Sequence, residues 1–243
     1  MTRTPICFDA TGTLIETAEN VGEVYHRVAL DFGVDLPGWR LDDAFRRVLR
    51  NAPLRGLEGD SIEARRVAET EWWRERIHQT FQATDSTVRF ADFPAFSTAL
   101  FDAYRTSAAW RARTGALETV RILRDRGFRL GVISNFDHRL PKILEGLGFD
   151  AFFDVILTPS ECGASKPSRA IFEAAAGSFG AAMDDLVYVG DDAPEVLEQV
   201  AALGLRVIGV DARSELTAIP DWLERAATLP RRVERGLPET APE

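Results

Sequence analysis

The stretch FDATGTL at residues 8–14 places a carboxylate, Asp9, where an apolar segment opens into a turn. Residues 5–8 are predicted to form a short buried strand, and Gly12 with its flanking threonines is typical of the turn that follows. In a parallel sheet, ligands and catalytic groups gather where the strands end. An aspartate at that place can act as a nucleophile or bind a metal, although it can also do no more than cap the turn.

From Gly115 onward, the sequence alternates predicted strands with predicted helices. Strands are expected over 128–133, 155–157, 186–189 and 206–210, and helices over 117–126, 138–147, 168–179 and 195–203. Repeated strand–helix units favour an α/β fold in which a doubly wound, Rossmann-like parallel sheet carries helices on both faces.

Residues 20–108 carry helical patterns and no convincing strand pattern. Helices are expected over 21–32, 42–51, 61–81 and 93–106. We therefore expect a core made of residues 1–16 and 113–229, with an inserted all-helical cap at 17–112. The tail, residues 230–243, is rich in proline and in charges of both signs and is expected to be disordered.

Composition excludes several classes of protein. The chain has 243 residues and a formal net charge of −9, from 29 basic and 38 acidic side chains, which argues against nucleic acid as a partner. Its two cysteines, Cys7 and Cys162, offer no disulfide framework or zinc cluster and suit a reducing compartment. No apolar run approaches the ~20 residues of a membrane span, and no signal-peptide segment opens the chain. We expect a cytoplasmic monomer or homodimer that acts on a small molecule and has no membrane partner.

Polar clusters also follow three of the later predicted elements. Ser134 and Asn135 follow one strand, Lys166 lies in a loop before a helix, and Asp191 and Asp192 follow another strand. Mg²⁺ in proteins typically takes one or two carboxylates together with substrate phosphate, and an ammonium can neutralise a transferring phosphoryl group. The chain uses lysine only twice among its 29 basic residues, which adds weight to Lys166. Together the clusters suit phosphoryl transfer.

Four segments, FDATGTL at 8–14, VISN at 132–135, GASKP at 163–167 and VGDD at 189–192, resemble in order the four motifs of the haloacid dehalogenase-like hydrolase superfamily. The helical insert resembles the helical cap of one of its subfamilies. The stretches VGEVYHRVALDFG at 21–33 and SNFDHRLP at 134–141 are similar to the branch that includes the rhythmically expressed gene 2-like proteins.

The resemblance implies roles for the site residues. Asp9 would be the nucleophile that forms an aspartyl-phosphate, and Mg²⁺ would bind the Asp9 carboxylate, the Thr11 carbonyl and Asp191. Asp192 would be a second metal ligand or a brace for Lys166. Ser134 and Lys166 would hold the phosphoryl oxygens and Thr13 would tie down the nucleophile loop, with the substrate-binding surface formed by Thr11, Gly12, Ser134, Asn135 and Lys166.

One residue departs from the superfamily's pattern. Most of its phosphatases carry a second aspartate two residues after the nucleophile, as the general acid for the leaving group, and this chain has Thr11 there. A missing general acid typically costs about 10²- to 10⁴-fold in rate. The prediction is a Mg²⁺-dependent phosphohydrolase acting on a small phosphorylated metabolite and slow on alkyl phosphates.

Two alternatives remain open. A 2-haloacid dehalogenase-like hydrolase needs neither metal nor general acid, and Arg40 or Arg46 could supply its cationic contact. The adjacent carboxylates Asp191 and Asp192 favour a metal instead. The second alternative is a protein of this fold kept for binding or regulation with little turnover, which the threonine at position 11 allows.

Overall fold

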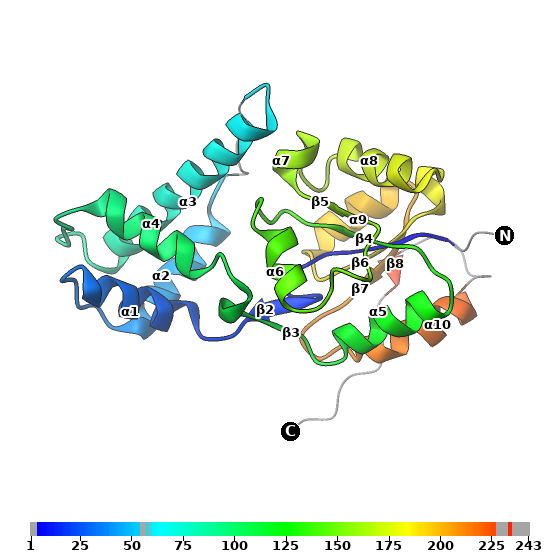
Figure 1. The fold of residues 1–243 in the computed structure, drawn as a ribbon, viewed down its shortest axis with the longest axis horizontal. Coiled ribbons are helices and arrows are strands. Elements are labelled where there is room, and N and C mark those ends of the chain that lie inside the picture. Colours follow the sequence, from blue (N-terminus) through cyan, green and yellow to red (C-terminus); the bar gives the residue numbers. More distant parts are fainter. Residues whose placement is uncertain (1–3, 54–56, 58, 227–232, 235–243) are drawn as a thin grey trace. The chain divides into compact units, whose positions relative to one another are not determined.

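The structure of the chain, a computed structural model, describes residues 4–53, 57, 59–226 and 233–234. It divides into two compact units, residues 1–16 with 112–243 and residues 17–111 (Figure 1). The division predicted from the sequence, a core of 1–16 and 113–229 with a cap of 17–112, stays an interpretation of the helix and strand patterns.

The first unit is built on a parallel sheet of six strands in the order β5-β4-β1-β6-β7-β8. The strands are β1 (Ile6–Phe8), β4 (Leu130–Ile133), β5 (Val155–Leu157), β6 (Val187–Gly190), β7 (Arg206–Gly209) and β8 (Val233–Glu234). β1 lies between β4 and β6, with Phe8 in register with Val132 and Val189. β1, β4 and β6 are buried throughout, as expected for strands covered on both faces.

Helices cover the sheet and confirm the predicted α/β fold class. They are α5 (Ala116–Asp125), α6 (Leu140–Gly146), α7 (Pro159–Cys162), α8 (Arg169–Phe179), α9 (Pro194–Ala202) and α10 (Ile219–Ala226), with short 3-10 turns η2 (Met183–Asp185) and η3 (Leu216–Ala218). Figure 1 shows α8 and α9 on one side of the sheet and α5 and α10 on the other. Local signals set the ends of α8, where Ser168 caps the first turn and Gly180 closes the helix with a positive φ of 61°.

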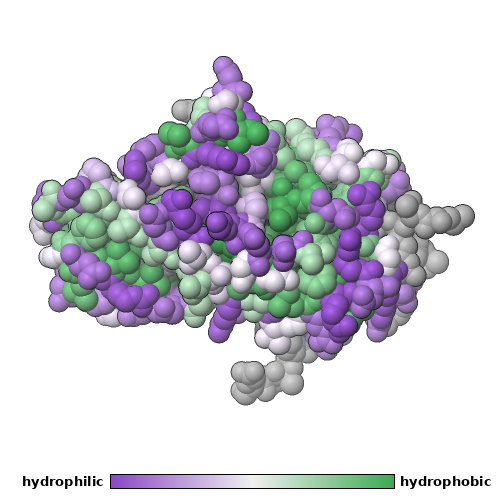
Figure 2. Space-filling view, viewed as in Figure 1, coloured by the Kyte–Doolittle hydropathy of each residue, from purple (hydrophilic) through white to green (hydrophobic). Residues whose placement is uncertain are grey.

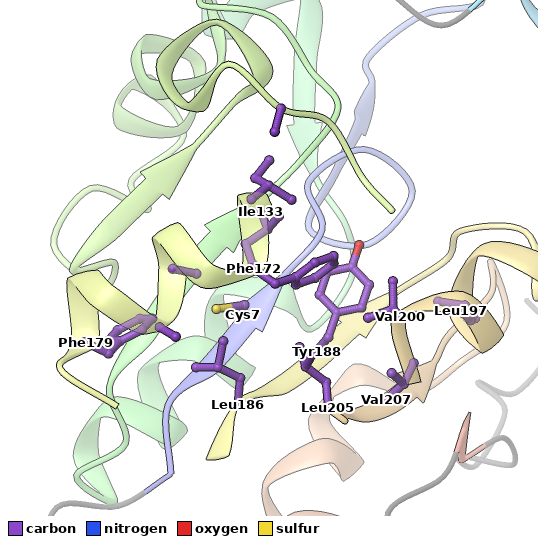
Figure 3. Packing of buried hydrophobic residues seen from close by; sticks show 14 residues of the cluster. Cys7, Ile133, Phe172, Phe179, Leu186, Tyr188, Leu197, Val200, Leu205 and Val207 are labelled. Atoms are coloured by element: carbon purple, nitrogen blue, oxygen red, sulfur yellow. The ribbon is translucent and has the colours of Figure 1, made fainter. Parts of the chain in front are cut away.

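One hydrophobic cluster fixes α8 and α9 on their face of the sheet. Cys7, Tyr188 and Val207 are in register on three neighbouring strands, so their side chains point to the same side. There they pack with Phe172 of α8 and Val200 of α9 (Figure 3). Burial raises the pKa of the Cys7 thiol to about 12, which makes this cysteine a packing residue.

The second unit contains α1 (Val21–Asp31), α2 (Gly38–Arg50), α3 (Ile62–Thr84) and α4 (Phe93–Ala103). Asn20, Ser61 and Asp92 each cap a helix by accepting a backbone N–H of its first turn. An aromatic cluster forms the interior, where the rings of Phe90 and Phe96 stack 4.0 Å apart. Aromatic pairs of this kind stabilise the unit beyond the apolar area that they bury.

Several short elements escape the sequence patterns. β2 (Ile15–Thr17) and β3 (Trp110–Ala112) form a separate two-stranded sheet, and η1 (Ser107–Ala109) precedes β3. No strand of the main sheet lies among the described residues between 20 and 108. α2 begins four residues earlier than the predicted helix over 42–51, directly after Pro37. The elements β2, β3 and α7 were not predicted because they mix apolar and polar residues over three or four positions. They lack the apolar run that marks a strand of the same length such as β5.

The predicted disorder of residues 230–243 falls outside the described residues, except at Val233 and Glu234. These two residues form β8 beside β7, so the prediction is wrong there. The edge of a sheet offers unpaired backbone groups, and a short segment of chain satisfies them here.

Within the described part of the chain, no helix is both long and apolar enough to cross a membrane. Hydrophilic residues occupy much of the face drawn in Figure 2, with apolar residues in separate patches between them.

Candidate active site

In the first unit, the predicted site residues lie together at the carboxyl ends of the central strands. β4, β1 and β6 are neighbours and run parallel, so the residues that follow them meet at the same end. Asp9 follows β1, Ser134 follows β4, and Asp191 and Asp192 follow β6. The backbone N–H of Asp9 donates to the Val189 carbonyl at 2.8 Å, which fastens the start of the loop after β1 to β6.

Asp9 is a buried carboxylate beside a buried ammonium. Its residue is 7% exposed, and its Oδ1 lies 3.0 Å from Nζ of Lys166. Burial raises the pKa of Asp9 above its usual value, the charge of Lys166 opposes that rise, and the charge of Asp192 adds to it. Oδ1 is buried and accepts no hydrogen bond of good geometry, so its contact with Lys166 is an ion pair.

Lys166 is the most enclosed charge of the site. It is 2% exposed, and Nζ donates to both carboxylate oxygens of Asp192 at 2.9 Å and to the Tyr188 hydroxyl at 2.5 Å. Burial lowers the pKa of Lys166, but the charges of Asp9 and Asp192 outweigh it, so the pKa lies above the usual value. The ammonium is therefore held charged. The contacts of Asp192 with Lys166 are those expected of a brace, and its role as a second metal ligand stays a prediction.

Asn135 fixes the backbone of Lys166. Its Nδ2 donates to the Lys166 carbonyl at 3.0 Å, and its Oδ1 accepts the Lys166 N–H at 2.8 Å. Both polar ends of the amide are thus used to hold the lysine loop, and the predicted contact of Asn135 with substrate remains a prediction. Ser134, 3% exposed, accepts the Phe136 N–H at 3.3 Å and stands at the same sheet edge as Asp9.

Thr13 and Gly12 hold the loop after β1 against Asp191. Thr13 Oγ1 donates to Asp191 Oδ1 at 3.0 Å and accepts the Asp191 N–H at 3.1 Å. Gly12 has a φ of 82°, and a Cβ at this position would lie 1.9 Å from Asp191 Oδ2. Only glycine permits both the backbone conformation and the close approach. Partial burial, followed by the charge of Asp9, raises the pKa of Asp191 to about 6.

The Thr11 carbonyl is held in a defined direction. The N–H of the same peptide group, that of Gly12, donates to the Ile15 carbonyl at 2.8 Å and thereby sets the peptide plane. The Thr11 side chain is exposed and carries no group that can exchange protons near neutral pH. The Thr11 side chain therefore cannot replace the general acid that most phosphatases of this superfamily carry at this position.

The donor chemistry of the loop suits Mg²⁺. Among the described residues, no group of three or more His, Cys, Asp or Glu side chains is arranged to hold a metal. Mg²⁺ needs fewer, because waters and substrate phosphate complete its shell. Three oxygen donors could hold it: Asp9 Oδ1, which is buried and accepts no hydrogen bond, the oriented Thr11 carbonyl and the Asp191 carboxylate.

Two residues of this region were missed by the sequence patterns. Tyr188 lies in an apolar strand and is indistinguishable there from a core residue, yet its hydroxyl reaches Lys166. Arg113, 8% exposed, donates from its guanidinium to the Gly12 carbonyl at 2.5 Å and to the Asp211 carbonyl at 2.7 Å. Tyr188 stands two residues before the Gly-Asp-Asp turn, the one signal that could have found it, while nothing in the sequence distinguishes Arg113.

The chain matches the family model described as haloacid dehalogenase-like hydrolase over residues 6–198. It is 33% identical over 174 residues to haloacid dehalogenase-like hydrolase domain-containing protein 3 of Mus musculus, covering 70% of this chain. The match spans 66% of the mouse protein, just under two thirds of its length. The chain is 28% identical over 197 residues to the rhythmically expressed gene 2 protein of Drosophila melanogaster, covering 76% of this chain and 74% of that protein.

Solved structures share the fold. A defluorinating L-2-haloacid dehalogenase superposes with a TM-score of 0.70 at 14% identity, covering 91% of this chain and 95% of the other. A predicted phosphoglycolate phosphatase from Haemophilus somnus superposes with a TM-score of 0.59 at 16% identity, covering 91% and 98%. One fold thus serves dehalogenases and phosphatases, and the likeness does not choose between them. On the family model and the curated relatives, this chain belongs to the haloacid dehalogenase-like hydrolase family, and its similarity to the rhythmically expressed gene 2 protein is consistent with that branch.

Proposed function

We propose that this chain is a Mg²⁺-dependent phosphohydrolase that acts through an aspartyl-phosphate on Asp9. The observation that carries the proposal is the pairing of a buried carboxylate with a buried ammonium 3.0 Å away, at the end of a central strand. A carboxylate so placed is a nucleophile, and an ammonium beside it can balance the charge of a phosphoryl group as it transfers.

The reaction proceeds in two displacements. An oxygen of Asp9 attacks phosphorus, a P–O bond forms to the carboxylate, and the bond to the leaving oxygen breaks with its electron pair going to that oxygen. Water then attacks the same phosphorus, the P–O bond to Asp9 breaks, and inorganic phosphate leaves as the carboxylate is restored. The water gives its proton to solvent, and the leaving oxygen takes one from solvent when its basicity requires it.

The negative charge of the site supports the proposal that it binds a metal ion. Asp9, Asp191 and Asp192 bring three negative charges against the single ammonium of Lys166. A phosphoryl group would add further negative charge. Asp9, the Thr11 carbonyl and Asp191 would hold Mg²⁺, which would supply positive charge to the phosphoryl group. Lys166 and Ser134 would donate hydrogen bonds to the phosphoryl oxygens.

The absence of a general acid at Thr11 favours substrates whose leaving group departs without a proton. An alkoxide is a poor leaving group unless it is protonated as the bond breaks, and the exposed threonine cannot supply that proton. Aryl phosphates, acyl phosphates and phosphoanhydrides release groups that depart without one. We infer that small phosphorylated metabolites of these kinds are the better substrates.

Asp9→Asn keeps the shape of the nucleophile and removes its charge. Turnover of acetyl phosphate or p-nitrophenyl phosphate with Mg²⁺ is expected to fall by at least about 10⁴-fold, as when other enzymes lose their nucleophile. Asp31→Asn, an exposed aspartate on α1, is the matched control and should keep full activity.

Release of phosphate that survives Asp9→Asn would contradict the covalent mechanism. Metal-independent release of halide from a 2-haloacid, abolished by the same substitution, would establish the dehalogenase instead. Absence of turnover with every ester, anhydride and haloacid would favour a binding protein.

Metal binding can be measured without turnover. In protein stripped with EDTA, Mg²⁺ at about 100 times its dissociation constant should raise the melting temperature by about 5–10 °C, because the ion binds only the folded chain. Asp191→Asn removes one of the proposed ligands and should abolish this rise, while Asp31→Asn should retain it. An equal rise in all three proteins would show that the ion binds elsewhere.

Thr11→Asp restores the carboxyl group at the position of the usual general acid. Turnover of an alkyl phosphate such as glycerol phosphate should rise, by up to about 10²- to 10⁴-fold if the full contribution of general acid catalysis returns. Turnover of p-nitrophenyl phosphate should change little. Comparing kcat for the two substrates, with Thr11→Asn as the uncharged control, tests this interpretation. A uniform change with both substrates would contradict it.

A further inference from the structure

Tyr188 joins the hydrophobic core to the charged site. Its ring lies in the cluster under α8 and α9, where it meets Phe172 edge-to-face at 5.6 Å between ring centroids. Figure 3 shows the hydroxyl at the far end of the ring, pointing away from Leu205. The residue is fully buried, so its ring has a fixed place and the hydroxyl projects from a rigid support.

The hydroxyl closes a triangle of hydrogen bonds. Lys166 Nζ donates to the Tyr188 oxygen at 2.5 Å, and Tyr188 donates to Asp192 Oδ2 at 2.5 Å. The third side is the pair of 2.9 Å contacts from Nζ to the two oxygens of Asp192. A tyrosine hydroxyl can donate one hydrogen bond while it accepts another, and phenylalanine can do neither.

The triangle of hydrogen bonds occupies part of the donor capacity of the Lys166 ammonium. A lysine ammonium has three N–H groups and no acceptor. The two Asp192 oxygens, both 2.9 Å from Nζ, can share one N–H, and the Tyr188 hydroxyl takes a second. The third N–H is left for the site, where Asp9 Oδ1 lies 3.0 Å from Nζ as an ion pair without hydrogen-bond geometry. Without the hydroxyl, the ammonium could rotate and share its donors differently between the two carboxylates.

We propose that Tyr188 is a positioning residue, whose hydroxyl aims one N–H of Lys166 at the place where the phosphoryl group is transferred. The inference rests on the proposed function for its consequence in catalysis, while the contact itself can be tested separately. The competing explanation is that Asp192 alone orients Lys166 and the tyrosine hydroxyl only satisfies its own hydrogen bonds.

Tyr188→Phe keeps the ring in the core and removes only the hydroxyl. Because a hydrogen bond to a charged group is lost, kcat/KM for acetyl phosphate should fall about 10- to 100-fold. The loss should lie mainly in kcat, since Lys166 remains charged and close to the site. Tyr25→Phe, at a buried tyrosine in the second unit, is the matched control and should leave kcat and KM unchanged.

The chain offers a direct readout, because its only lysines are Lys142 and Lys166. In protein labelled with ¹⁵N-lysine, the ammonium resonance of buried Lys166 should shift in Tyr188→Phe, while that of exposed Lys142 stays in place as an internal reference. In the unaltered protein, the Lys166 ammonium protons should give NOEs to the Tyr188 ring, whose centroid lies 5.2 Å from Nζ. This second measurement does not depend on the folding of a variant.

The outcomes separate the two proposals. A Lys166 resonance that is identical in the Tyr188→Phe and unaltered proteins, or the absence of NOEs to Tyr188, overturns the positioning role whatever the turnover. A shifted resonance with unchanged kcat/KM also overturns it. An unaltered protein without any phosphatase activity, in which the resonance still shifts on Tyr188→Phe, overturns the proposed function and supports the contact.

Discussion

The contact between the Lys166 ammonium and the carboxylates of Asp9 and Asp192 is the interaction on which the site depends. Three carboxylates from the ends of two adjacent strands would repel one another in a buried place, and one ammonium holds two of them within 3.0 Å of itself. Breaking a buried ion pair by removing one partner typically costs about 3–5 kcal/mol. Asn135, Tyr188 and the hydrophobic cluster under α8 all converge on the placement of this one charge.

The fold makes that convergence possible through strand order. β1 is central, with β4 and β6 on either side, so residues separated by more than a hundred positions in sequence meet at one edge. The loop after β1 is then fastened on two sides, by Thr13 to Asp191 and by Arg113 to the Gly12 carbonyl. A site supported on rigid elements can hold its groups in the geometry that a reaction needs without moving them at the moment of reaction.

Much of the candidate site was predictable from the sequence, because its residues lie in short local patterns. An apolar strand that ends in Asp9, and another that ends in Gly190 with two aspartates after it, are enough to predict carboxylates at a sheet edge. The role of Asn135 was not predictable, because its partner is the backbone of a residue 31 positions away. Tyr188 escaped for a related reason: an aromatic residue in a buried strand is expected in the core, and only the three-dimensional arrangement shows where its hydroxyl points. β2 and β3 are three residues each and show no period at all.

The central claim is that a phosphoryl group is carried covalently by Asp9, and trapping that group tests it most directly. The protein, with Mg²⁺ and acetyl phosphate, would be quenched in acid during turnover and reduced with borohydride, which converts a phosphorylated aspartate to homoserine. Mass spectrometry of the peptide containing residues 4–27 should then show homoserine at position 9 and unmodified aspartate elsewhere. Steady turnover with an unmodified Asp9 peptide, or homoserine at Asp191 or Asp192 instead, would contradict the account.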